Sequence, residues 1–81
     1  MRIKPLRDDL LQFLKDHQLK HKFEKQKALF EADFRHPSLN TEILEPKDLR
    51  IYSFRIDIKY RAIFLITQEE AEIIDINKHY R

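Results

Sequence analysis

The spacing of apolar side chains predicts two helices in the first half of the chain. Residues 7–35 contain neither proline nor glycine and are rich in Leu, Lys, Glu and Gln, which are strong helix formers. An apolar stripe over residues 10–14 predicts a first helix, which either Asp8 or Asp9 would cap. A break near residues 17–20 would end this helix and complete one arm of a helical hairpin.

A second helix is predicted over residues 20–35. Phe23, Phe30 and Phe34 are spaced by seven and four residues, which places them on one helical face and predicts that they belong to the core. Pro37 ends the helical half, because proline disfavours helical backbone in the residue before it. The following residues, 38–46, are predicted to form a loop.

Beyond this loop the apolar period changes to two, as in a strand with one buried face. Strands are predicted over residues 51–58, 60–67 and 71–78, with turns at residues 57–59 and 68–70. For residues 2–4 we prefer a short edge strand to a disordered tail. Close spacing favours an antiparallel meander, so the predicted fold is a single α+β domain over residues 1–81, of order β-α-α-β-β-β, with both helices on one sheet face.

Alternation assigns each strand residue to one of two sheet faces. The predicted core face carries Tyr52, Phe54, Ile56, Ala62, Phe64, Ile66, Ile74 and Ile76. The opposite face carries Arg55, Arg61, Asp75, Asn77 and His79 together with Ile51, Ile63, Leu65 and Ile73. Since the helices cover the first face, we expect the second to be open and to bind a partner.

Composition narrows the possible classes of function. The 81 residues include no cysteine and no glycine, which excludes disulfides, thiol nucleophiles and glycine-rich phosphate loops. The longest apolar run, Ala62–Ile66, is far shorter than the roughly 20 residues of a membrane span, and the charged N-terminus is unlike a signal peptide. We therefore expect a cytoplasmic protein that makes no membrane contact. The net charge of +2 is too balanced to identify a nucleic-acid binder.

Residues suited to phosphate chemistry converge on the open face. Arg55, Arg61 and His79 come from three predicted strands, and Tyr80 follows His79. Guanidinium groups bind phosphate, and an imidazole can exchange a proton near neutral pH. Either Glu42 or Glu45, in the loop before the first of these strands, would supply the carboxylate of an acid–base pair for attack by a ribose 2′-hydroxyl on a phosphate.

This chemistry requires no metal and no small-molecule cofactor. His17 and His21 have the i, i+4 spacing of a metal pair, but no third ligand lies near them in the sequence. We expect no metal site.

The second half of the chain resembles the RelE/ParE toxin superfamily of type II toxin–antitoxin systems. The resemblance is carried by LRIYSFRIDIKYRAIF at residues 49–64, by IIDI at residues 73–76 and by the ending His79-Tyr80. The superfamily also has the predicted order of elements. Two departures are Arg50, where many relatives have glycine, and the lack of the lysine cluster with which RelE contacts RNA.

The ending His79-Tyr80 resembles the YoeB branch, whose members are ribosome-dependent messenger-RNA endonucleases. This resemblance implies that Glu42 is the general base, that Arg61 stabilises the scissile phosphate, that His79 is the general acid and that Tyr80 positions the RNA. Further RNA or phosphate contacts would come from Arg55, Lys47 and Lys59. The protein would then be an mRNA interferase that inhibits translation.

The resemblance leaves other functions open, because the superfamily shares one fold among different activities. A second hypothesis is a non-enzymatic, ParE-like inhibitor of DNA gyrase, and a third is a catalytically silent member that only binds an antitoxin. All three imply an acidic cognate antitoxin that covers the open face, as in plasmid stabilization systems. The nuclease hypothesis adds the ribosome and messenger RNA as partners.

Overall fold

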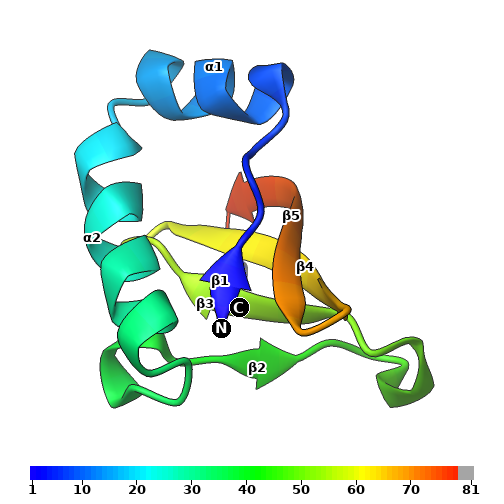
Figure 1. Cartoon of the computed structure of the whole chain (residues 1–81). Coiled ribbons are helices and arrows are strands. Elements are labelled where there is room, and N and C mark those ends of the chain that lie inside the picture. The colour runs from blue at the N-terminus through cyan, green and yellow to red at the C-terminus, as the bar shows by residue number, and fades with distance from the viewer. Residues whose placement is uncertain (79–81) are drawn as a thin grey trace.

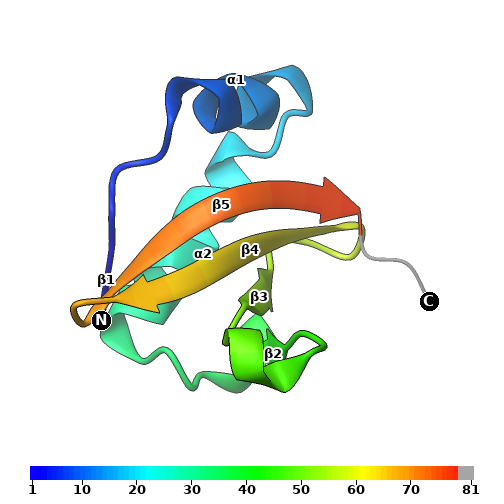
Figure 2. The same cartoon turned by 90° about the vertical axis from the view of Figure 1, so that its right-hand side faces the viewer.

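The computed structural model describes residues 1–78 as two helices packed against one face of a sheet (Figures 1 and 2). The elements are β1 (Arg2–Ile3), α1 (Asp8–Asp16), α2 (Lys20–Ala32), β2 (Glu42–Ile43), β3 (Tyr52–Arg55), β4 (Tyr60–Thr67) and β5 (Glu70–Lys78), with short 3-10 helices η1 (Pro37–Leu39) and η2 (Lys47–Leu49). The predicted α+β class is confirmed. No helix among residues 1–78 has the length and apolar character to cross a membrane.

The sheet has the strand order β1-β5-β4-β3-β2. The strands β3, β4 and β5 form the predicted antiparallel meander, β2 adds to it by antiparallel pairing with β3, and β1 pairs in parallel with β5. The predicted edge strand at residues 2–4 is therefore confirmed as β1. A further strand, β2, lies inside the segment 38–46 that was predicted to be a loop. Two residues are too few for a period of two to be recognised.

The break between the helices lies where the apolar stripe predicts it, but the cap of α1 differs from the prediction. Arg7 is the N-cap and makes no side-chain capping bond, whereas Asp8 and Asp9 occupy the first turn. Carboxylates there interact favourably with the helix dipole. At the other end Gln18 has a φ of 56°, and Leu19, buried to 2% exposure, donates its N–H to the Leu14 carbonyl.

The helix α2 ends at Ala32, three residues before the predicted end. Asp33 leaves the helical conformation, and its side-chain Oδ1 accepts a hydrogen bond from the Arg35 N–H while its carbonyl accepts from the His36 N–H. Such local bonds of aspartate compete with helix continuation. Phe23 and Phe30 are buried as predicted, but the core prediction for Phe34 is wrong, since this side chain is 37% exposed.

A β-bulge in β5 reverses the predicted faces of Ile73 and Ile74. Ile63 pairs with Asp75, whereas the next residue, Phe64, pairs with Ile73, so Ile74 is the additional residue. One inserted residue exchanges the two faces for everything beyond it. Consequently Ile73 is buried in the core at 3% exposure, where the sequence pattern predicted it on the open face, and Ile74 is only half-buried.

The remaining core agrees with the predicted face except at one end of the sheet. Phe54, Ile56, Ala62, Phe64 and Ile76 are all buried. Ile66, which was predicted to join them, is 43% exposed. Ile66 lines an open cavity together with Phe34, which lies beyond the end of α2 at Ala32.

Turns in this glycine-free chain force ordinary residues into left-handed backbone. Positive φ angles occur at Gln18, Asn40, Arg50, Gln68 and Glu69. Gln68 and Glu69 form the two-residue loop between the paired residues Thr67 and Glu70, with φ of 50° and 68°. Two consecutive positive φ angles define a type I′ hairpin turn, which strongly favours glycine at its second position.

Glu69→Gly should therefore raise the free energy of unfolding by about 0.5–1 kcal/mol, because relief of the left-handed strain exceeds the entropy that glycine adds to the unfolded chain. Urea denaturation measures this change. The control is Glu72→Gly, at an exposed strand position of β5, which should destabilise by about 0.5–1 kcal/mol. Destabilisation of similar size by both substitutions would contradict the strain argument.

The turn between β3 and β4 is held by Asp57. Its Oδ1 accepts hydrogen bonds of 2.8 Å from the N–H groups of Lys59 and Tyr60, and its Oδ2 lies 3.3 Å from the Lys22 ammonium on α2. Burial alone would raise the pKa of Asp57, but these backbone bonds and the Lys22 charge outweigh it and lower the pKa below its ordinary value.

Because the folded pKa of Asp57 is lowered, its contribution to stability is present above the unfolded pKa and is lost as the pH falls through the folded pKa. Asp57→Asn should cost about 1 kcal/mol at about pH 7, and the difference from wild type should shrink towards about pH 3. Urea titrations across this range measure it. Asp48→Asn, an exposed aspartate of η2, is the control, and a difference for Asp57→Asn that is constant with pH would refute the assignment.

Candidate active site

A buried arginine ties three segments together on the sheet face opposite the helices. Arg61, on β4, donates from Nε to the Ser53 Oγ at 2.9 Å and from Nη2 to the Ser53 carbonyl at 3.3 Å. Nη2 also donates to the carbonyl of Asn40, which lies two residues before the start of β2 at Glu42. Arg61 is only 3% exposed, so the prediction that nothing covers it is wrong. The segment around β2, predicted as a loop, folds beside β3 and encloses the guanidinium.

Glu42 lies next to this guanidinium. It pairs with Ser53 across β2 and β3, which places the two side chains on the same face, and its Oε1 lies 4.0 Å from Arg61 Nη2. The Glu42 side chain is 44% exposed, whereas that of Arg61 is 4% exposed. The carboxylate is therefore open to a ligand from solvent, with the guanidinium behind it.

Arg55 completes a cluster on this face. It pairs directly with Arg61 across β3 and β4 and is only half-buried. Burial lowers the pKa of Arg61, the Glu42 carboxylate raises it, and the nearby Arg55 charge lowers it again. Two guanidinium groups and one carboxylate leave net positive charge at a partly open surface, which suits an anionic ligand.

Gln26 fixes this cluster from the helix side. Its buried side-chain amide nitrogen donates to the carbonyl of Arg55 at 2.7 Å and to that of Ser38 in η1 at 3.1 Å. A single residue of α2 thereby positions the end of β3 and the start of the segment that leads to Glu42. Neither Gln26 nor Ser53 was predicted from the sequence as part of this site. For Gln26 a signal existed, since it is a polar residue at a helical position between Phe23 and Phe30.

Three other predicted site residues make no hydrogen bond or ion pair with this cluster within residues 1–78. Glu45 is exposed between β2 and η2, Lys47 begins η2, and Lys59 lies in the turn between β3 and β4. Within residues 1–78 none of the three pairs with Arg61, so Glu42 rather than Glu45 is the carboxylate beside it. His79 and Tyr80 lie outside the described residues.

Metal-binding side chains do not gather in this part of the chain. Among residues 1–78, no three His, Asp or Glu side chains are arranged to hold a metal ion.

No protein-family model and no curated protein matches this chain.

Ser53→Ala should destabilise the protein by about 1–3 kcal/mol, because it leaves the buried Nε of Arg61 without its acceptor. Urea denaturation measures the loss. The matched control is Ser38→Ala, at an exposed position, which should change stability by less than about 0.5 kcal/mol. Equal effects of the two substitutions would show that the Ser53 hydroxyl does not hold Arg61.

Proposed function

We propose that this chain is the toxin of a type II toxin–antitoxin system and acts in the cytoplasm as a ribosome-dependent messenger-RNA endonuclease. One observation carries the proposal. Glu42 from β2, Arg55 from β3 and Arg61 from β4 meet on one sheet face, with the Glu42 carboxylate 4.0 Å from the Arg61 guanidinium. Attack of a ribose 2′-hydroxyl on the adjacent phosphate requires a group that accepts the hydroxyl proton and positive charge that stabilises the phosphate. The cluster provides both.

Glu42 acts as the general base in this proposal. Its exposed carboxylate accepts the proton of the 2′-hydroxyl as the 2′-oxygen forms a bond to phosphorus. Arg61 stands behind the carboxylate and orients it, and the bonds from Arg61 to Ser53 and Asn40 fix that orientation. A charge held in place before the substrate binds needs no reorganisation during the reaction.

Arg55 makes the direct phosphate contact. It is the less buried of the two arginines, so its guanidinium can bind two phosphate oxygens while Arg61 adds charge from behind. The resemblance assigns the remaining roles. His79 donates a proton to the 5′-oxygen as the bond from phosphorus to that oxygen breaks, and Tyr80 stacks on or orients a base. The products are a 2′,3′-cyclic phosphate and a 5′-hydroxyl end.

One observation favours a catalytically silent scaffold as the second candidate. Nε and Nη2 of Arg61 already donate to protein acceptors, so this arginine stabilises the fold whether or not RNA binds. Such a member would bind only its acidic antitoxin. It would leave both messenger RNA and gyrase unaffected, which also distinguishes it from a ParE-like gyrase inhibitor.

Translation of a reporter messenger in a purified bacterial system, with mapping of new RNA 5′ ends, tests the nuclease. We expect cleavage that requires ribosomes. Glu42→Gln should lower its rate by about 10²–10⁴-fold, because the variant carboxamide cannot accept the proton. Arg55→Ala should lower it by about 10²-fold or more through loss of phosphate stabilisation, and His79→Gln should abolish detectable cleavage.

Glu45→Gln is the matched control for Glu42→Gln and should leave the rate within about twofold, because Glu45 is exposed and lies outside the cluster. Loss of cleavage in the Glu45 variant alone would move the general base to that residue. Intact messenger with normal translation would exclude the nuclease, and a gyrase supercoiling assay would then separate the inhibitor from the silent scaffold.

A further inference from the structure

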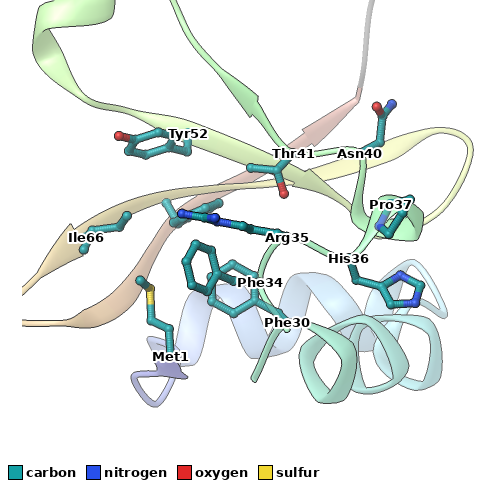
Figure 3. Close-up of a pocket in the computed structure, with 11 residues that line it drawn as sticks. Met1, Phe30, Phe34, Arg35, His36, Pro37, Asn40, Thr41, Tyr52 and Ile66 are labelled. Atoms are coloured by element: carbon teal, nitrogen blue, oxygen red, sulfur yellow. The ribbon is translucent and has the colours of Figure 1, made fainter. Parts of the chain in front are cut away.

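A pocket opens on the helix side of the sheet, at the C-terminal end of α2 (Figure 3). It has a volume of about 620 Å³, and its apolar walls are formed by Met1, Phe30, Phe34, Tyr52, Phe64 and Ile66. The rim carries polar groups, among them Arg35 and Thr41. This pocket lies on the sheet face opposite that of Glu42, Arg55 and Arg61, and the proposed nuclease makes no use of it.

The early end of α2 exposes apolar side chains around this pocket. Phe34 is 37% exposed and Ile66 is 43% exposed, and both line the pocket. Ile43 is 40% exposed and pairs with Tyr52, which places it on the same face beside the pocket wall. Several large apolar side chains on one surface, joined to a cavity, are typical of a protein interaction site.

Among residues 1–78, no strand pairs with the outer edge of β2, which borders the same surface. The strand β2 is the last of the sheet order, and the Leu44 N–H bonds to the Ile51 carbonyl. Since bonding alternates along an antiparallel strand, the backbone N–H and carbonyl of Ile43 point away from β3. This edge can accept a further extended segment, whose alternate side chains would reach the pocket.

The positive charge of Arg35 at the rim of the pocket favours a negatively charged binding partner. The Arg35 side chain extends across the pocket between Tyr52 and Phe34, with its guanidinium carbon 5.5 Å from the Phe34 ring centroid (Figure 3). Among residues 1–78, no carboxylate lines the pocket and Arg35 has no ion-pair partner. A carboxylate of a partner protein could therefore form an ion pair with Arg35.

We infer that this surface binds an extended, acidic segment of a partner protein. The segment pairs with the backbone of Ile43, inserts one large apolar side chain between Phe30, Phe64 and Ile66, and places a carboxylate on Arg35. This surface is separate from the Glu42–Arg61 cluster, so the inference holds independently of the nuclease activity.

Selection of a random seven-residue peptide library, displayed on phage, against the whole protein tests this inference. We expect enriched peptides that combine a large apolar residue with Asp or Glu at alternate positions. The most enriched peptide, made synthetically, should shift the backbone amide resonances of Ile43, Phe34 and Ile66 in the labelled protein. Arg35→Glu should weaken its binding by about tenfold or more, because the introduced charge repels the acidic segment.

Ile43→Pro should weaken binding by a similar factor, since it removes the N–H that the added strand requires. Arg55→Glu, on the opposite face, is the control and should leave peptide affinity within about twofold. Glu42→Gln should do the same, although it slows RNA cleavage. The inference is overturned if no peptide is enriched, if Arg35→Glu binds equally well, or if the shifted amides surround Arg55. Shifts produced by 4-phenylbutyrate but by no peptide would also overturn it, in favour of a small-molecule pocket.

Discussion

The buried guanidinium of Arg61 holds in place the segment on which the proposed chemistry depends. The strand β2 has two residues, and pairing of that length is marginal by itself. Bonds from Arg61 to the Asn40 carbonyl and to Ser53 fasten the start of this segment to β3 and β4. The dependence is mutual, because a buried cation without acceptors would be strongly destabilising. Glu42 is held beside Arg61 because Arg61 and the loop between η1 and β2 stabilise each other.

The same segment is fastened a second time from the opposite layer. Gln26 of α2 donates to the Ser38 carbonyl, two residues before Asn40, and to the Arg55 carbonyl. Asn40 itself accepts a bond from Arg61 and also lines the apolar pocket. The loop between η1 and β2 therefore borders both surfaces, the charged cluster on one side of the sheet and the apolar pocket on the other.

The sequence predicts the parts of this molecule that repeat and misses the parts that depend on one distant contact. Helical spacing and the period of two identified both helices and the strands β3, β4 and β5, although β3 covers only Tyr52–Arg55 of the predicted 51–58. Alternation placed Arg55 and Arg61 on a common face. The bulge at Ile74 and the end of α2 at Asp33 are single-residue events that no period records. The burial of Arg61 and the role of Gln26 arise from carbonyls 21 and 29 residues away along the chain. The family resemblance implied that Glu42 is the general base. Its position 4.0 Å from the Arg61 guanidinium results from the pairing of β2 with β3, which the sequence pattern did not predict.

The pairing of β1 with β5 links chain synthesis to folding. Arg2 is in register with Glu70, so the first and last strands of the described chain are neighbours in the sheet, and this strand pairing spans the longest sequence separation among residues 1–78. The strand β5 also separates β1 from β4, and it supplies Ala71, Ile73 and Ile76 to the core. A nascent chain that stops before β5 has α1 and α2 but no complete surface against which to pack them. Folding of this domain must therefore wait until β5 has left the ribosome.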